Sequence, residues 1–347
     1  MRQPTSQQVT GGIGSKPLYP DYQTTDKMLL AKEIIAAEFK KAEHYLIEEL
    51  HSSVPMLDRI TGYLIHTKGK QLRPVFLLLC ARLGGALNDI SYRAAAMVEI
   101  VHTASLIHDD IVDDSMTRRG AFSVNALWKS RAAVFAGDNL FIKAVLLPLI
   151  NGDHKTLQIF SKAIEQTIAG ELMQLGKTQK LNLREDVYYD IIRQKTATLL
   201  SAACEAGAAS TFTDEQQIEK IGLFGEKVGM AFQIKDDLFD YGTADVGKPL
   251  GNDIKERKVT LPLIYTLNNC DGSTKRKLLQ LIKQDQVTAD DMNFLQKTVK
   301  EAGGFAYAEQ KMLSYRQEAL DILYEFPESS VRHALEELVM YTTERKY

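Results

Sequence analysis

The amino-acid sequence predicts an all-α protein built as a large helical bundle. Apolar residues recur at steps of three and four, the spacing of one helix face, in two clear stretches: Leu29, Leu30, Ile34, Ile35 and Phe39, and Ile221, Phe224, Val228, Phe232 and Leu238. Sustained alternation with a period of two, which is typical of strands, is hard to find. Glycine and proline cluster at breaks such as Gly84-Gly85 and Asn151-Gly152. The segments between breaks run to roughly 15–30 residues, which suits bundle helices.

Four segments define the organisation of the chain. Residues 1–26 are rich in Gln, Thr, Gly and Pro without apolar periodicity, so we predict a flexible N-terminal tail followed by one domain over residues 27–347. The stretch Ala94–Ile107 is apolar and helix-patterned, and it leads directly into an acidic run. Between two apolar segments, Tyr241–Arg257 contains three glycines, a proline and mixed charges. We interpret it as a long loop, and loops of this length are often active-site lids.

Composition narrows the class of protein. Hydrophobic residues at 45% and charged residues at 25% are ordinary for a soluble globular protein. The net charge of -3, without a long basic run, argues against nucleic-acid binding. Cys80, Cys204 and Cys270 form no CxxC pair, which predicts reduced thiols instead of disulfides or a zinc site. No uninterrupted apolar run approaches the ~18 residues of a membrane span, and no signal-peptide layout opens the chain. We expect a cytoplasmic protein without stable membrane insertion.

The strongest functional signal is the acidic motif DDxxD. It occurs twice, each time at the end of an apolar helical stretch, first as Asp109, Asp110 and Asp113 and again as Asp236, Asp237 and Asp240. Carboxylates four residues apart share a helix face and repel each other by a few tenths of a kcal/mol unless a counter-ion is present. One such run is usually a solvated face, but two copies in one chain arise by chance in well under about 1% of sequences.

Aspartates from two helices are suitable ligands for a hard divalent cation. Magnesium prefers oxygen ligands and is usually shared between one or two carboxylates and substrate phosphates. Two facing DDxxD helices would therefore hold magnesium ions with a diphosphate between them. Arg118 and Arg119 follow the first motif, and the guanidinium group matches phosphate oxygens. The residues thus predict a metal-dependent diphosphate site.

Seven motifs, taken in order, resemble those of the trans (E-type) polyprenyl diphosphate synthases, in particular the bacterial long-chain, octaprenyl-like members. They are GKQLRP (69–74), EIVHTASLIHDDIVDDSMTRRG (99–120), GDNL (137–140), GELMQL (170–175), KTATL (195–199), GMAFQIKDDLFDYG (229–242) and GKPLGNDIKERKVTLP (247–262). Each short motif is weak alone, whereas the ordered set is specific. The resemblance runs from about Leu29 to the C-terminus.

The resemblance implies a single all-α bundle around a central cavity, with the two aspartate motifs facing each other at its mouth and Mg²⁺ as the cofactor. The implied catalytic residues are the six metal-binding aspartates with Lys195 and Lys258. The implied ligands of the allylic diphosphate are Arg118, Lys195, Thr196, Gln233, Lys248 and Lys258. The implied ligands of isopentenyl diphosphate are Lys70, Arg73, His102 and Arg119. Taken singly, Lys70 and Arg73 would be solvated cations, His102 a core histidine and Gln233 a buried amide. Family members are usually homodimers, and the apolar segment Phe122–Ile150 is the candidate interface.

The implied reaction needs no covalent nucleophile. Metal ions and cationic side chains stabilise the departing pyrophosphate, the allylic C–O bond ionises, and the isopentenyl double bond attacks the carbocation. A proton then leaves, with the released pyrophosphate as the base. Water must be excluded, and the Tyr241–Arg257 loop, anchored by Lys248 and Lys258, is the candidate lid.

The helix before Asp109 bears on product length. Ala104 and Ser105, one turn upstream, are small, whereas short-chain members of the family carry a bulky aromatic floor near that place, and Val101 lies further up. From Arg93 to Asp109 the helix spans about 24 Å at ~1.5 Å per residue, room for roughly five isoprene units. We expect a long product of about six to eight units, of the type attached to respiratory quinones. Alternatively, Ala104 and Ser105 are packing residues, and Phe135 or Phe141 closes the tunnel sooner to give a short-chain (farnesyl or geranylgeranyl) product.

Three further classes remain as alternatives. Class I terpene cyclases share the first aspartate motif and the all-α fold, but they usually carry an Asn/Ser/Glu motif in place of the second. An HD-type phosphohydrolase is suggested by His102, His108 and Asp109, although the two histidines lie six residues apart and the other motifs would be unused. A non-catalytic subunit of a heteromeric synthase commonly lacks aspartates or the arginine pair, which this chain retains.

Overall fold

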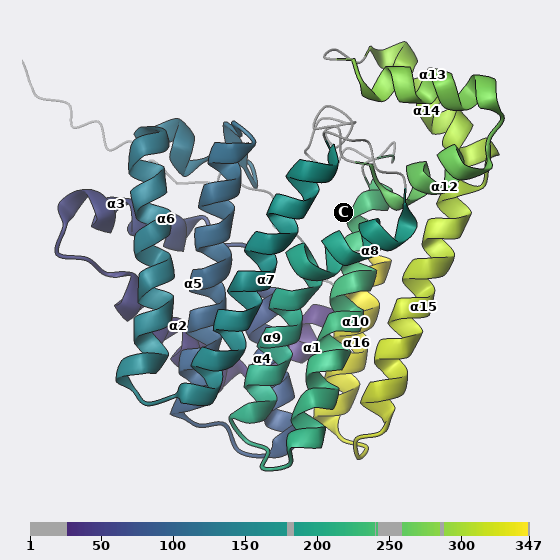
Figure 1. Cartoon of the computed structure of the whole chain (residues 1–347). Coiled ribbons are helices and arrows are strands. Elements are labelled where there is room, and N and C mark those ends of the chain that lie inside the picture. The colour runs from purple at the N-terminus through teal and green to yellow at the C-terminus, as the bar shows by residue number, and fades with distance from the viewer. Residues whose placement is uncertain (1–25, 179–183, 240, 242–258, 285–287, 346–347) are drawn as a thin grey trace, which may run out of the picture.

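The computed structural model describes residues 26–178, 184–239, 241, 259–284 and 288–345, and it confirms the predicted all-α bundle (Figure 1). The helices are α1 Asp26–Ile34, α2 Ala36–Leu50, α3 Pro55–His66, α4 Leu72–Gly84, α5 Asp89–Val112, α6 Val124–Ile150, α7 His154–Thr178, α8 Glu185–Ile192, η1 Arg193–Ala197, α9 Thr198–Ala209, α10 Glu215–Phe239, α12 Leu261–Asn269, α13 Gly272–Ile282, α14 Ala289–Glu301, α15 Gly304–Tyr324 and α16 Ser330–Glu344. Of the predicted tail and the predicted lid loop, only Asp26 and Tyr241 fall within the described residues.

The long helices lie side by side and enclose one main hydrophobic core (Figure 1). The most extensive packing joins α5 to α6, α10 to α9 and α15, and α4 to α9. Large aromatic side chains such as Phe76, Phe160 and Phe224 are fully buried in this core. Two smaller apolar clusters follow, one where α8 and η1 meet α10, α12 and α15, and one among α12, α13 and α14. The core therefore holds the ends of α5 and α10, which carry the aspartate motifs, on a rigid frame.

Helix α5 packs against α2, α4, α6, α7 and α9. It begins at a capping box, in which the Asn88 side chain accepts from the Ser91 backbone N–H and the Ser91 hydroxyl accepts from the Asn88 N–H, an arrangement that satisfies backbone donors at a helix start. From Ala94 to Val101 every residue is buried. The helix ends at Val112, with Asp113 as its C-cap. The apolar stretch thus carries the first aspartate motif to one end of the bundle.

Two local structures depart from the predicted regular helices. The segment after the first motif forms a β-hairpin, with β1 Thr117–Arg118 paired antiparallel to β2 Ala121–Phe122. Its turn residues, Arg119 and Gly120, have φ angles of 53° and 76°, the positive values that a two-residue type I′ turn requires. The KTATL segment begins in the π-helix η1, and π-turns inside helices occur frequently at functional sites.

Helix α6 is the most apolar long helix of the described chain. Its length and mean hydropathy of 1.7 would allow it to cross a membrane, although core helices of soluble proteins pass the same test. One side of α6 packs against α5, and residues such as Ala136, Leu140 and Ala144 are buried. Its opposite side carries exposed apolar residues, among them Phe135 and Ile142.

Candidate functional site

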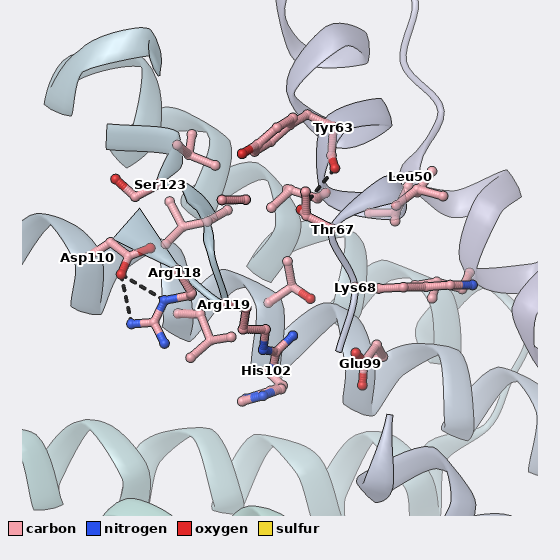
Figure 2. Close-up of a pocket in the computed structure, with 18 of the residues that line it drawn as sticks. Leu50, Tyr63, Thr67, Lys68, Glu99, His102, Asp110, Arg118, Arg119 and Ser123 are labelled. Carbon is pink, nitrogen blue, oxygen red and sulfur yellow. Dashed lines mark hydrogen bonds and ion pairs between the residues drawn. The ribbon is translucent and has the colours of Figure 1, made fainter. Parts of the chain in front are cut away.

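The first aspartate motif projects its carboxylates in different directions. Asp110 is buried, and its Oδ1 accepts from Arg118, 2.8 Å from Nε and 2.7 Å from Nη2 (Figure 2). The hairpin folds back over the end of α5 and brings this guanidinium to the motif. Asp109 is half-buried on another face of α5, and Asp113 is exposed at the helix end. Asp110 therefore already has a cationic partner within the protein.

Asp109 carries a carboxyl group whose ionisation is disfavoured, mainly by burial. Burial, followed by the nearby carboxylate of Glu171, raises the pKa of Asp109 to about 6, and the charges of Lys195 and Arg118 oppose that rise. Glu171 comes from α7 and accepts from Lys195 Nζ at 2.8 Å. A carboxylate that is costly to ionise beside a second carboxylate is a site that a cation would stabilise.

The second aspartate motif is joined to the first through η1. Asp237 is buried; Tyr188 on α8 donates to its Oδ2 at 2.7 Å, and Gln233 Nε2 donates to its Oδ1 at 2.9 Å. Gln233 Oε1 accepts in turn from the Thr196 hydroxyl at 2.8 Å. Because Lys195, the neighbour of Thr196, pairs with Glu171 beside Asp109, this series of contacts connects the two motifs across one region.

The residues proposed for isopentenyl diphosphate lie within electrostatic range of the second aspartate motif. Arg73 Nη1 lies 3.1 Å from His102 Nε2. Burial lowers the pKa of Arg73, and the negative charges of Glu99 and Asp236 oppose this shift. The pKa of His102 is held well below its usual value by burial and by the charges of Arg73 and Arg119, so its neutral ring accepts from Arg73. The structure therefore brings Arg73, His102 and Arg119 together, within electrostatic range of Asp236.

Close approaches explain two of the motif glycines. A Cβ at Gly69 would lie 2.4 Å from Arg119 Cζ, so the guanidinium rests against the backbone of the GKQLRP segment. A Cβ at Gly229 on α10 would lie 2.5 Å from Ala197 Cα in η1. Because that neighbour is backbone, α10 and η1 can approach this closely only when residue 229 has no side chain.

Backbone strain gathers near the same residues. Four non-glycine residues of the described chain have positive φ, and three of them, Gln71, Asp114 and Arg119, lie in or beside the GKQLRP and DDxxD–RRG segments. Such conformations cost about 1–3 kcal/mol each and tend to cluster at functional sites. The strain supports a functional role for both segments.

A cavity lies beside these residues, between α2, α3, α5, α6 and the hairpin (Figure 2). Its polar end includes Glu99, His102 and Arg119, and its apolar wall includes Leu50 and Ile107. Glu99 is buried, and burial raises the pKa of its carboxyl. The cavity follows the α5 face that bears His102, Leu106 and Asp110. It therefore lies directly beside the guanidinium groups of Arg118 and Arg119.

The donors of this region suit magnesium shared with a diphosphate. Among the described residues, no three acidic, histidine or cysteine side chains gather closely enough to hold a metal ion by themselves. Magnesium in phosphate sites generally takes only one or two carboxylates and completes its shell with water and phosphate oxygens. The charge environment of Asp109 fits such an ion.

Three of the predicted site residues lie outside the described part of the chain, and two residues of the site were not predicted from the sequence. Asp240, Lys248 and Lys258 lie outside the described residues. Glu171 belongs to the GELMQL motif, for which no role of a single residue was predicted. The acidic side chain of Glu171 is the feature of that motif that could have indicated a part in the site. Tyr188 stands in no motif, so only its tertiary contact with Asp237 reveals it.

The residues considered for product length divide between the core and the surface. Val101 and Ala104 are fully buried, and Ser105 donates to the Val101 carbonyl at 3.1 Å. Phe141 packs against His108, with 5.6 Å between the ring centroids. Phe135 is 68% exposed and therefore cannot close a tunnel inside this chain, which corrects that alternative.

Comparisons with known proteins agree with this arrangement. A family model described as polyprenyl synthetase matches residues 54–299. Heptaprenyl diphosphate synthase component 2 from Geobacillus stearothermophilus is 30% identical over 323 residues, covering 92% of this chain and 100% of that protein. A short chain isoprenyl diphosphate synthase from Methanothermobacter thermautotrophicus is 31% identical over 330 residues, covering 92% and 100%. The crystal structure of a polyprenyl synthase from Caulobacter crescentus CB15, complexed with calcium and isoprenyl diphosphate, matches with a TM-score of 0.87 and 33% identity, covering 92% of this chain and 98% of that one.

Proposed function

Because this chain belongs to the polyprenyl synthetase family and is therefore a prenyltransferase, we propose that it condenses isopentenyl diphosphate with an allylic diphosphate to make an all-trans polyprenyl diphosphate, in a magnesium-dependent reaction. The observation that carries this proposal is the hydrogen-bonded path from Thr196 through Gln233 to Asp237, beside Lys195 and its partner Glu171, whose charges act on Asp109.

The aspartates divide into two groups. Asp109, Asp113 and Asp236 are the candidate magnesium ligands, together with Asp240 outside the described residues. Asp110 and Asp237 instead hold neighbouring groups in place, since both are buried and bonded to Arg118 and to Tyr188 with Gln233. Magnesium, when bound, neutralises diphosphate charge and favours departure of the leaving group.

The remaining side chains bind and orient the substrates. Arg118, Lys195, Thr196 and Gln233 contact the allylic diphosphate, joined by Lys248 and Lys258, and the cations stabilise charge that develops as the C–O bond breaks. Lys70, Arg73 and Arg119 hold isopentenyl diphosphate so that its double bond attacks the allylic carbon. Neutral His102 orients Arg73. The proton lost afterwards passes to the released diphosphate, so the protein supplies no base.

Incubation of the purified protein with labelled isopentenyl diphosphate, magnesium and allylic primers of several lengths tests this function. Chromatography should show linear products longer than each primer. Consumption of a primer without isopentenyl diphosphate would instead indicate a terpene cyclase. One relative is named as a component of a synthase, so absence of any turnover by the chain alone would indicate that it needs a partner subunit.

We propose a long product of about six to eight isoprene units, of which roughly five would lie along the α5 face of Val101, Ala104 and Ser105, given a rise of ~1.5 Å per helical residue. Relatives include both a heptaprenyl and a short-chain synthase, so a product of farnesyl or geranylgeranyl length, limited by Phe141, is the alternative. A long product would suit quinone side chains.

Ala104→Phe and Ser105→Phe are expected to shorten the product by several isoprene units, because an aromatic ring would block the path of the growing chain. Chromatography of the dephosphorylated products measures this. Ser314→Phe is the control, since Ser314 is exposed on α15. An unchanged product distribution in both test variants would contradict the tunnel assignment.

We propose that two copies of the chain associate through α6. We also propose that residues 27–347 of each copy form a single domain and that the protein is cytoplasmic. Exposed apolar residues follow one side of α6 and continue onto α7: Leu127, Val134, Phe135, Ile142, Leu146, Leu149, Ile168 and Leu172. Exposed apolar surface of this extent marks an interaction site. The packing of α1 against α16 supports a single unit.

Phe135→Glu combined with Ile142→Glu is expected to convert the dimer into a monomer, because charges at the centre of an apolar interface lose their hydration. Light scattering coupled to size-exclusion chromatography measures the mass. Leu313→Glu on α15, also at an exposed leucine, should leave the mass unchanged. A wild-type monomer, or a dimer that survives the double change, would argue against this interface.

A further inference from the structure

The C-terminal helix α16 lies beyond the residues matched by the family model, 54–299, yet it reaches the proposed substrate site. Tyr341 is buried, and its hydroxyl accepts from Lys70 Nζ at 2.7 Å. The same ammonium lies 5.4 Å from the centroid of the Tyr341 ring. The two distances place the ammonium beyond the ring edge, nearly in line with the C–O bond, so the hydroxyl of this one α16 side chain holds Lys70.

Four residues later, Arg345 follows the end of α16 and contacts the second aspartate motif. Its Nη2 forms an ion pair with Asp236 Oδ1. Its guanidinium lies 4.0 Å from the Phe232 ring centroid and 5.5 Å from that of Phe239, so three residues on one face of α10 surround it. Arg345 Nε is buried and has no hydrogen-bond partner in the described structure, so this donor costs free energy for as long as the guanidinium stays in this position.

Helix α16 presents these two side chains from a rigid position. It packs against α1, α4, α10 and α15, and Leu335, Leu338 and Val339 are fully buried. Lys70 and Asp236 belong to segments far apart in the chain. One short element at the C-terminus therefore contacts a cation proposed for isopentenyl diphosphate and a carboxylate proposed for magnesium.

We propose that Tyr341 and Arg345 are positioning residues that make α16 part of the substrate site. Tyr341 holds Lys70 in place for isopentenyl diphosphate. Arg345 acts as an internal counter-ion of Asp236, which a divalent cation with its diphosphate must displace. The proposal rests on the proposed function, because it takes from it the roles of Lys70 and Asp236.

Removal of the Tyr341 hydroxyl is expected to raise KM for isopentenyl diphosphate about 3–10-fold, because one hydrogen bond to Lys70 is lost. The kcat value and the KM for the allylic primer should each change by less than about twofold. The variant is Tyr341→Phe. Its matched control is Tyr324→Phe. Tyr324 is the last residue of α15, and its hydroxyl donates to Glu336 on α16 at 2.8 Å. Equal KM values for isopentenyl diphosphate in the two variants would overturn the role of Tyr341.

Arg345→Gln is expected to tighten the binding of Mn²⁺, measured by electron paramagnetic resonance with inorganic pyrophosphate present, by about threefold or more. Arg316→Gln is the control for the loss of one positive charge away from Asp236. Arg316 Nη1 lies 3.7 Å from Glu344 Oε1 on α16. Arg345→Lys, which keeps the charge but loses the planar group, should fall between wild type and Arg345→Gln. Binding no tighter than in the control, or no Mn²⁺ binding at all, overturns the counter-ion role.

The two failures are distinguishable. If the proposed function is wrong, the wild type consumes a primer without isopentenyl diphosphate, or it forms no elongated product even when a partner subunit is supplied, whereas the Mn²⁺ measurement still reports on Arg345. If only the role of α16 is wrong, the wild type forms product and both test variants behave like their controls. The melting temperatures of all variants should lie close together, since a general loss of structure would move every parameter at once.

Discussion

Replacement of Asp109 or Asp236 by alanine is expected to lower kcat by about a thousandfold or more, which corresponds to roughly 4 kcal/mol of lost transition-state stabilisation. Both residues are proposed to bind magnesium, and the leaving diphosphate would keep its charge without that contact. Folding should change little in Asp109→Ala, because burial disfavours the Asp109 carboxylate, whereas Asp236→Ala also removes the ion pair with Arg345. Steady-state kinetics at saturating magnesium, with melting temperatures measured alongside, provide the comparison.

Asp290→Ala is the matched control, since Asp290 is an exposed aspartate on α14. It should retain wild-type kcat and stability. Near-normal turnover in both Asp109→Ala and Asp236→Ala would refute the metal assignment, and a collapse of the melting temperature would show that these carboxylates support the fold instead.

Gly229→Ala is expected to destabilise the protein by about 1–3 kcal/mol, the usual cost of forcing atoms into a packed interior. The added Cβ would lie 2.5 Å from Ala197 Cα, so α10 and η1 must separate. Because η1 carries Lys195 and Thr196, turnover should fall as well. Urea denaturation followed by circular dichroism measures the free energy of unfolding.

Gly176→Ala on α7 is the control, because a Cβ there meets nothing within 4 Å. Alanine at that place should stabilise the helix by about 0.5–1 kcal/mol. If both variants unfold at the same urea concentration, the contact between α10 and η1 is looser than the structure indicates.

Repeated patterns made most of the fold predictable. The three- and four-residue periodicity identified the helices, because each buries one stripe of apolar side chains. The hairpin was missed because two-residue strands are too short to show alternation. The π-helix was missed because the apolar pattern of KTATL is the same whether the helix contains a π-turn or not.

The sequence by itself determined the chemical type of the site. Two DDxxD motifs, the Arg118-Arg119 pair and the ordered markers are local patterns, and their residue types are sufficient to predict metal and diphosphate binding. Which aspartates already have partners could not be predicted. Asp110 faces Arg118, and Asp237 faces Tyr188, only because α5 and α10 end beside the hairpin and α8.

Only the tertiary structure decided that α16 belongs to the site. Lys70 and Asp236 meet Tyr341 and Arg345 across sequence separations that leave no periodic or spacing signal in the chain. A tyrosine and an arginine near a C-terminus are ordinary surface residues until packing places them. Local patterns therefore determined what chemistry is available here, and the packing of distant segments decided which charges meet.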